Sequence, residues 1–351
     1  YDGTRFQLIN GNSFTNLKAS GTLGVTGVAT LGNGAILGTP ASGILTSCTG
    51  LNYDGFKNRI INGAMVLDQR NAGASVAFTT SAYTLDRWVG AVGTATGTTI
   101  QRSTTSTTGF SNSALITIGT GASPAAGAVN RIYQVIEGFN IADLAWGTAS
   151  AATVTLSFWV RSSVTGTFSG ALYGASTIQS YPFNYTINAA NTFEQKTVTI
   201  AGPTTGTWDS TNGTGVYVNF DLGSGTNFET TAGAWAVGTF ISATGSTNLC
   251  ATSGATFYIT GVQLEKGSTA TSFDYRPYGT ELMLCQRYYQ AFNNVYVVQS
   301  GVTSFPINMR ATPTFVGGSG GFNVGGTPNA VFANVYQTTA AYQALTASSE
   351  L

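Results

Sequence analysis

Acidic side chains are the residues of this sequence whose type and spacing come closest to catalytic chemistry. Glycosidases hold two carboxylates across the scissile bond, and Asp209, Asp221 and Glu229 lie within one short stretch of the chain. Trp208 precedes the first of them and Trp235 follows the last. Spacing alone does not place any two in one cleft, and the fourteen acidic residues must also serve turns and ion pairs. We therefore predict that the chain is not an enzyme, with a polysaccharide depolymerase as an alternative.

Nucleophilic and metal chemistry have less support. Residues 317–321, GGSGG, match the pattern around a hydrolase serine, but the chain has no histidine to accept the proton of Ser319. Histidine is also the commonest zinc ligand. Cys48, Cys250 and Cys285 match no metal or redox spacing, so we expect buried thiols in a protein assembled in a reducing compartment. No cofactor and no metal are predicted.

Aromatic residues are the better candidates for binding. A sugar presents an apolar C–H face and a ring of hydroxyls, so exposed aromatic rings flanked by amides and carboxylates recognise it. Alternation puts some aromatic residues on the polar faces of predicted strands, where packing does not require them, and others lie near loops. The glycan-binding candidates are Trp159, Tyr217, Tyr173, Trp146, Trp208 and Trp235. If their strands share a sheet, Trp159, Tyr217 and Tyr173 form one stacking face; packing against another domain or protomer is the alternative.

A second candidate surface lies near the end of the sequence. Aromatic residues and asparagine stand there among glycines, a composition similar to that of adaptable antibody paratopes. Its residues are Phe322, Asn323, Tyr336 and Tyr342. Packing within a trimer is the alternative for this segment.

Charge is scarce except in residues 273–289, FDYRPYGTELMLCQRYY, which contain Asp274, Arg276, Glu281 and Arg287. This cluster follows the last strand of a long β region, so we predict a structural joint between two domains rather than a ligand site. A short helix is expected after Pro277, with Thr280 as its N-cap. The residues that recur at helical spacing, and are expected on one face of this helix, are Leu282, Cys285, Tyr289 and Phe292.

Two more groups of charged residues stand near apolar ones. They are Asp86 and Arg87 in DRW, and Asp68 and Arg70 in LDQRN. An Asp–Arg pair that fixes strand ends is the favoured interpretation. Recognition of sugar hydroxyls is the alternative.

The composition fits an all-β protein. The 351 residues suffice for two or three domains, and 45 glycines favour short strands and tight turns over helices. Fourteen basic residues balance fourteen acidic ones, which argues against a nucleic-acid partner. No apolar run approaches the roughly 18 residues of a membrane span, so no membrane insertion is expected.

Residues 153–160 and 215–223 alternate between apolar and polar side chains, which is typical of strands with one buried face. The polar positions between the apolar ones, among them Asn219 and Asp221, are expected to point outward. The inward positions are Val154, Leu156, Phe158 and Val160 in the first segment, and Val216, Val218, Phe220 and Leu222 in the second.

Three domains are predicted along the chain. Residues 1–50 repeat Leu-Gly pairs at short intervals, and so short a unit needs neighbouring copies to bury a core. We interpret them as a repetitive β shaft, with a flexible linker as the alternative. Residues 51–278 are predicted to form a jelly-roll β-sandwich. Residues 279–351 are predicted to form a short helix and a small C-terminal β domain.

Several long phrases resemble the fibre and appendage proteins of tailed bacteriophages. They are FKNRIINGAMVLDQRNAGAS and YTLDRW, then TFYITGVQLEKGSTATSFDYRPYGTELMLCQRYYQ and FPINMRATPTF. The phrases YDGTRFQLIN and LGTPASGILTSCTGL resemble shaft segments of the same group. The resemblance implies a homotrimeric virion appendage with a jelly-roll domain similar to carbohydrate-binding modules. Ala64 stands where the group often has an acidic residue, so the resemblance implies no metal site here.

The functional expectation is therefore non-catalytic attachment of a trimer to a host cell-surface glycan. The expected partners are two further copies of the chain, the glycan, and other virion proteins on the N-terminal side. The expected location is the virion, after assembly in the host cytoplasm. A purely architectural virion protein, such as a head fibre or connector, is the alternative from another class.

Overall fold

The computed structural model describes residues 56–78, 82–297, 301–304, 309–311, 314–316, 322–323, 332–335 and 341–351. The predicted shaft, residues 1–50, lies outside the described residues, as do Cys48, Ser319 and Tyr336. Strands dominate the described part, which confirms the all-β prediction. The three predicted domains and the two boundaries between them stay predictions.

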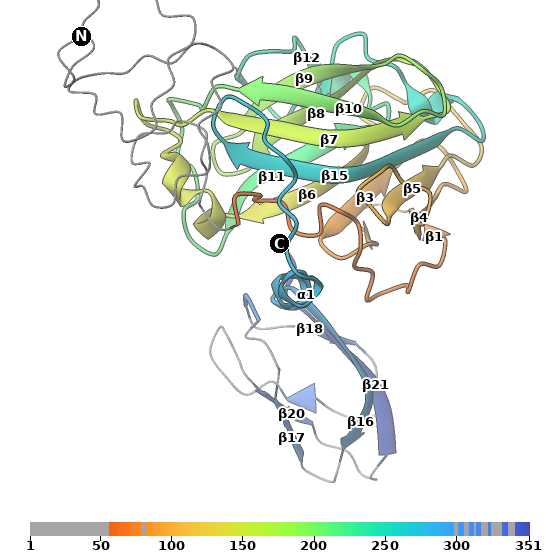
Figure 1. The fold of residues 1–351 in the computed structure, drawn as a ribbon, viewed down its shortest axis with the longest axis vertical. Coiled ribbons are helices and arrows are strands. Elements are labelled where there is room, and N and C mark those ends of the chain that lie inside the picture. The colour runs from red at the N-terminus through yellow and green to blue at the C-terminus, as the bar shows by residue number, and fades with distance from the viewer. Residues whose placement is uncertain are drawn as a thin grey trace, which may run out of the picture. The chain divides into compact units, whose positions relative to one another are not determined.

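Two antiparallel sheets form a β-sandwich (Figure 1). Sheet A has six strands, in the order β1 (Val76–Ala77), β4 (Thr99–Ser103), β5 (Ser113–Thr117), β15 (Thr256–Lys266), β7 (Val154–Ser162) and β10 (Glu194–Ile200). Sheet B has seven, in the order β13 (Ala236–Val237), β9 (Gln179–Ile187), β8 (Gly166–Gly174), β11 (Thr214–Asp221), β6 (Asn130–Glu137), β3 (Trp88–Val92) and β2 (Ala82–Tyr83). Strand pairs far apart in sequence, such as β15 with β5 and β7, hold the sandwich together.

The core lies between the two sheets and confirms the inward positions predicted from alternation. The apolar residues of β7 and β11 belong to one buried cluster to which both sheets contribute. Asn219 and Asp221 point outward as predicted, yet both are buried. The Arg131 guanidinium donates to Asn219, and Ser242 donates to Asp221. Ser242 belongs to the segment after β11, which folds back over sheet B. This segment contains η3 (Thr226–Phe228) and the parallel pair β12 (Glu229–Thr230) and β14 (Ser242–Ala243).

Sheet A is also covered on its outer face. The segment that follows β15 crosses it, and Thr271 donates from its hydroxyl to Glu265 at 2.6 Å. The Thr155 hydroxyl donates to the carbonyl of Gly267 at 2.8 Å. Gln263 and Glu265 are fully buried as a result, although they point away from the core.

The remaining elements lie outside the two large sheets. Three further 3-10 helices, η1 (Gly138–Asn140), η2 (Ala142–Leu144) and η4 (Leu249–Ala251), lie in connections. After α1 (Tyr278–Gln286), β16 (Tyr289–Val297) pairs with β21 (Ala341–Ser348), which also pairs with β18 (Thr314–Val316). A second set pairs β20 (Phe332–Val335) with β17 (Gly301–Ser304) and β19 (Phe322–Asn323). Within the described residues no helix has the length and apolar character to cross a membrane.

The predicted helix exists, but two details of the prediction were wrong. Pro277, not Thr280, is the N-cap, and its carbonyl accepts from the backbone N–H groups of Thr280 and Glu281. The helix ends at Gln286, so Tyr289 and Phe292 lie on β16 instead. Cys285 and Cys250 are buried free thiols, as expected.

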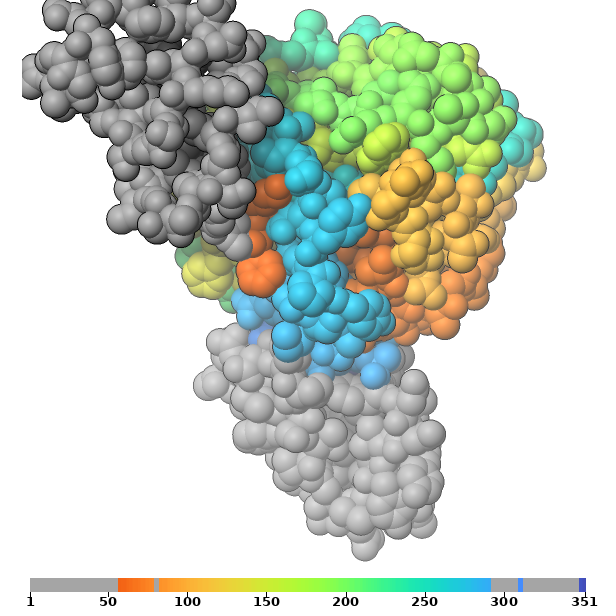
Figure 2. Space-filling view, viewed as in Figure 1, coloured from red at the N-terminus to blue at the C-terminus, as the bar shows by residue number. Residues whose placement is uncertain are grey.

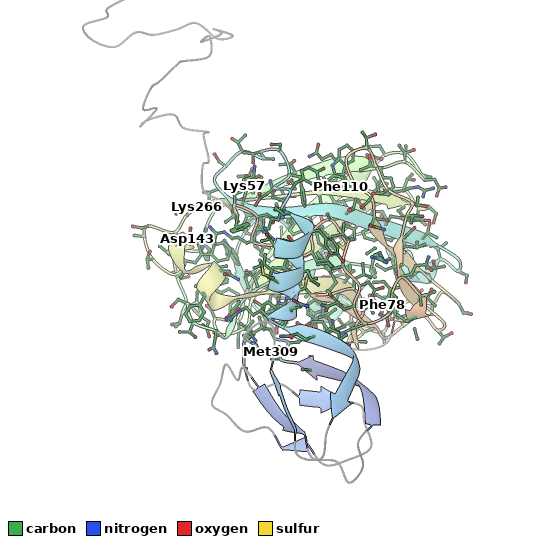
Figure 3. All side chains as sticks on the ribbon, turned by 60° about the horizontal axis from the view of Figure 1, so that its bottom comes forward. Lys57, Phe78, Phe110, Asp143, Lys266 and Met309 are labelled. Atoms are coloured by element: carbon green, nitrogen blue, oxygen red, sulfur yellow. The ribbon has the colours of Figure 1, made fainter. Side chains whose placement is uncertain are left out.

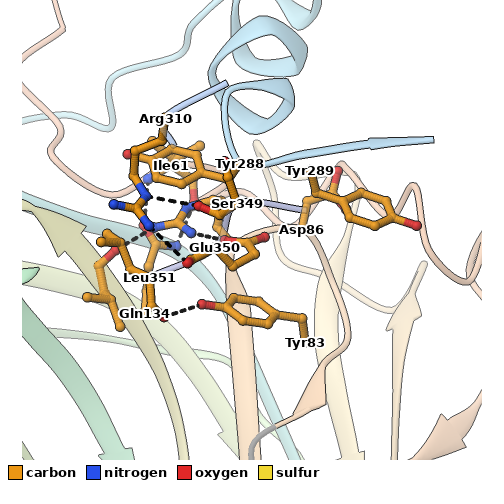
Figure 4. Close-up of polar contacts among 12 residues, drawn as sticks. Ile61, Tyr83, Asp86, Gln134, Tyr288, Tyr289, Arg310, Ser349, Glu350 and Leu351 are labelled. Carbon is orange, nitrogen blue, oxygen red and sulfur yellow. Dashed lines mark hydrogen bonds and ion pairs between the residues drawn. The ribbon is translucent and has the colours of Figure 1, made fainter. Parts of the chain in front are cut away.

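Three arginines outside residues 273–289 join the sandwich to the last residues of the chain (Figure 4). Arg87, 1% exposed, forms an ion pair with Glu350 and donates to the Val135 carbonyl at 2.6 Å. Arg70 reaches the other oxygen of Glu350 at 3.0 Å. The Arg310 guanidinium donates to the neighbouring Ser349 carbonyl at 2.9 Å.

Within residues 273–289, Arg287 and Tyr288 serve the same joint. Arg287 pairs with Glu137 at 2.6 Å, and the Tyr288 hydroxyl donates to that carboxylate at 2.6 Å. The Tyr288 ring in turn lies 3.5 Å from the Arg87 guanidinium. Asp86 is buried and pairs with Arg70 at 3.5 Å. Arg287 therefore has a structural role, as predicted for residues 273–289. The predicted Asp–Arg pair forms between the two motifs, Asp86 with Arg70, while Arg87 pairs with Glu350 instead.

Candidate functional site

A row of tyrosine rings lies on the outer face of sheet B. Tyr217 of β11 faces Tyr173 of β8 across the strand pair, and their ring centroids are 5.3 Å apart. Tyr133 of β6 continues the row on the other side, 5.6 Å from Tyr217. Tyr173 and Tyr217 are half-buried, while Tyr133 is buried. The strand alternation that sends Val216 and Val218 into the core therefore sends aromatic rings to the opposite face.

Arg131 fixes one end of this row. Its guanidinium lies 4.2 Å from the centre of the Tyr133 ring and donates to Asn219 Oδ1 at 2.7 Å. Asn219 donates in turn to the Ala171 carbonyl at 3.1 Å. Burial lowers the pKa of Arg131 and raises the pKa of Tyr217. Arg131 therefore ties the Tyr133 ring to the Asn219 amide at this end of the row.

The segment that folds back over sheet B borders the row at its other end. Thr239 lies 3.5 Å from the Tyr173 hydroxyl, measured between the two oxygens. A buried polar network anchors this segment: Ser242 Oγ is 2.9 Å from Ser169 Oγ and donates to Asp221 Oδ2 at 3.0 Å. Hydroxyl and phenol groups thus flank the rings, which is the combination expected for sugar recognition.

Asp221 carries the anchoring network as a buried acid. Burial raises its pKa to about 6, although hydrogen bonds from Ser224, Ser242 and Gly223 oppose the shift. The carboxylate accepts backbone N–H groups of Ser224 at 2.9 Å and Gly223 at 3.1 Å. Its contacts hold the segment onto the sheet.

Replacing Asp221 with asparagine is expected to flatten the pH dependence of stability between about pH 4 and pH 7. The folded pKa of about 6 exceeds the ordinary 3.8, so the folded chain holds the proton more tightly. That stabilisation is complete below the unfolded pKa and is lost as the pH rises through the folded pKa. A shift of this size corresponds to about 3 kcal/mol. Urea titrations across this range should show a steeper fall in the wild type than in Asp221→Asn; parallel curves would contradict the assignment.

Three of the four candidate tryptophans gather at one end of the sandwich. Trp146 makes edge-to-face contacts with Trp208 at 4.9 Å and with Trp235 at 5.8 Å, and the latter two are 5.4 Å apart. Every indole N–H donates to a backbone carbonyl: those of Ala152, Thr205 and Ala201. Trp146 is 6% exposed and belongs to the core. The cluster closes the end of the core. The three tryptophans therefore lie together, but they pack on the core instead of forming the predicted rim of the tyrosine row.

Trp159 lies apart from the tyrosines. It is on β7 of sheet A, while Tyr217 and Tyr173 are on sheet B. The expectation of one stacking face was therefore wrong for Trp159 and right in placing Tyr217 beside Tyr173. The second candidate surface cannot be compared in this way, since the side chains of Phe322, Asn323, Tyr336 and Tyr342 lie outside the described residues.

The other two candidate carboxylates are Asp209, which has local hydrogen bonds, and Glu229. Asp209 accepts from the backbone N–H and the hydroxyl of Thr211, at 2.7 and 2.8 Å, and so fixes a turn. Glu229 begins β12. Across residues 56–351, so far as they are described, no three His, Cys, Asp or Glu side chains are grouped to hold a metal.

Sequence reasoning missed Tyr133 and Arg131. Both lie in the phrase RIYQVIEG, where alternation puts Arg131, Tyr133 and Val135 on one face. That pattern could have identified them as outward residues. It could not have paired β6 with β11, since those strands are far apart in sequence.

Comparison with known proteins gives structural similarities only. No family model matches the chain, and no curated protein is similar to it in sequence. A putative sugar binding protein from Bacteroides thetaiotaomicron has a TM-score of 0.38 at 13% identity, over 60% of this chain and 100% of that one. The enzymatically active domain of bacteriophage CBA120 tailspike protein 4 has a TM-score of 0.32 at 14% identity, over 60% of this chain and 22% of that one.

A family 11 carbohydrate-binding module from Clostridium thermocellum, in complex with a mixed-linked tetrasaccharide, has a TM-score of 0.29 at 9% identity. The similarity extends over 55% of this chain and 96% of that module. The chain thus spans about a fifth of the tailspike domain and nearly all of the two smaller proteins. At these TM-scores and identities the neighbours assign no function to the chain.

Proposed function

We propose that this chain is the glycan-binding part of a trimeric bacteriophage appendage, and that it binds a host cell-surface glycan without cleaving it. The tyrosine row on the outer face of sheet B, Tyr133, Tyr217 and Tyr173, carries the proposal. The two half-buried rings offer a surface for the apolar face of a sugar. The neighbouring Thr239 and the phenol groups supply hydrogen bonds to its hydroxyls.

The appendage part of the proposal rests on the resemblance of several sequence phrases to those of phage fibre proteins. Three chains on one shaft would give avidity to weak sites, because the second and third contacts become intramolecular. Other virion proteins would bind on the N-terminal side. Buried free thiols at Cys250 and Cys285 are compatible with assembly in a reducing host cytoplasm before the virion carries the protein.

A glycan array tests the binding function. The wild-type chain is expected to bind at least one bacterial surface glycan, and the double variant Tyr173→Ala/Tyr217→Ala is expected to lose about 5- to 150-fold in affinity. The reason is that each ring face contributes about 0.5–1.5 kcal/mol. Affinities for the selected glycan are measured by titration calorimetry.

The matched control is Tyr258→Ala, which removes a tyrosine from sheet A instead of sheet B. It should bind as the wild type does. Equal affinities for all three proteins would contradict the assignment to this face, and an array without any bound glycan would favour an architectural virion protein. Sedimentation of the chain with and without residues 1–50 tests the trimer, which is expected to dissociate when the shaft is deleted.

A further inference from the structure

A pocket lies on the other side of the sandwich, beside the outer face of sheet A. Its volume is about 300 Å³. It forms where residues 58–66, the loop around Phe110 and residues 273–281 meet. Figure 2 shows the sky-blue segment that contains residues 273–281 crossing this face between orange residues of the N-terminal part, and Figure 3 labels Phe110 there.

A bulge in β15 leaves room for Phe110, which lines one wall of the pocket. Gly261 has a φ of +60° and lies where the register between β15 and β7 shifts. A Cβ on Gly261 would come within 2.6 Å of the Phe110 ring and 3.0 Å of Trp159. A side chain at this position would therefore displace Phe110, and the aromatic wall depends on the glycine.

Three aromatic rings make up this wall. Phe110 lies 5.0 Å from Phe273 and 5.6 Å from Tyr275, and the last two are 4.9 Å apart. The Tyr275 hydroxyl donates to the Gly109 carbonyl at 2.8 Å, which ties the two segments together. Tyr275 nevertheless remains 59% exposed, and Tyr278 is similarly exposed at the rim. Such exposed apolar area is available to a ligand.

The other wall is polar and rigid. Arg276 is held by Glu281 at 3.1 Å and by backbone carbonyls of Asn58 and Ile60. Asp274 Oδ2 accepts from the Asn58 backbone N–H at 3.2 Å and lies 3.8 Å from Arg276 Nε. Among the described residues nothing donates to Asp274 Oδ1, and this side chain is 20% exposed. A hydrogen-bond acceptor is thus left for a ligand.

We infer that this pocket is a second binding site, which takes one neutral sugar unit. The C–H face of the sugar packs on Phe110 and Tyr275, while a hydroxyl donates to Asp274. Two carboxylates against one guanidinium disfavour an anionic ligand. Both carboxylates already pair with Arg276, so neither is left as an unpaired charge for a cationic ligand. The volume is near the lower limit for ligand pockets, which suits a single unit rather than a chain. The site shares its ligand class with the proposed function but none of its residues.

Saturation-transfer difference NMR of the full chain tests this site. The probes are the methyl glycosides of glucose, galactose and N-acetylglucosamine at millimolar concentration. At least one is expected to receive saturation from the wild type. Tyr275→Ala and Asp274→Asn should each reduce that signal severalfold, because one removes the ring and the other weakens the acceptor. Tyr275→Phe, which loses only the bond to Gly109, should retain it.

The matched control is Phe139→Ala, since Phe139 is also 59% exposed but lines a different hollow. It should leave the signal unchanged, as should Tyr173→Ala/Tyr217→Ala on sheet B. A signal lost only in the sheet B variant would overturn this site and leave the proposed function standing. No transfer to any of the three probes, or equal transfer in wild type, Tyr275→Ala and Asp274→Asn, would overturn it outright.

Discussion

Replacing Arg87 with alanine is expected to destabilise the folded chain by about 3–5 kcal/mol. The substitution leaves the Glu350 carboxylate buried with Arg70 as its remaining ion-pair partner. It also removes the bond to the Val135 carbonyl and the contact with the Tyr288 ring. Burial by itself lowers the pKa of Arg87, but Glu350 raises it and the net shift is upward, so the guanidinium is charged at every accessible pH. Urea denaturation measures the loss as a change in midpoint.

Lys266→Ala is the control for Arg87. Lys266 pairs with Asp143 at 3.5 Å, and both side chains are about half exposed (Figure 3). Such a pair contributes about 0–1 kcal/mol. Replacing both Arg87 and Glu350 with apolar residues of similar size should recover most of the loss, because no unpaired charge remains. Equal effects of Arg87→Ala and Lys266→Ala would show that the joint does not depend on this ion pair.

Replacing Trp146 with alanine is the second large effect, also about 3–5 kcal/mol. Its ring fills the end of the core between Trp208 and Trp235. The substitution leaves a cavity there and an unpaired carbonyl on Ala152. Trp159→Ala removes the same residue type from a partly exposed position on sheet A and should cost clearly less. Equal losses in the two variants, measured by urea denaturation, would contradict a core role for Trp146.

Local pattern predicted the parts of this fold that depend on neighbouring residues. Alternation is a property of a single strand, so it correctly predicted that Val154 and Val216 point inward and Tyr217 points outward. It could not separate Trp159 from Tyr217, because sheet membership depends on which distant strands pair. It also could not predict that Asp221 would be covered, since that depends on a long loop returning to its own sheet.

The joint was predicted in kind but not in detail. The density of charge in residues 273–289 indicated a structural role, and Arg287 does pair with a sandwich residue, Glu137. No local signal linked Arg87 to Glu350, which is more than two hundred residues away. Nor did the pattern show that Asp274 and Tyr275 also line a pocket, because its opposite wall comes from residues 58–66.

An NMR spectrum of the chain labelled with ¹³C at its tyrosine rings tests the central claim most directly. The glycan selected on the array is titrated into the labelled protein, and the signals are assigned with single Tyr→Phe variants. Shifts of Tyr173 and Tyr217, with the core residue Tyr185 unchanged, are the predicted result. Saturating glycan that leaves Tyr173 and Tyr217 unshifted would show that the outer face of sheet B does not bind it.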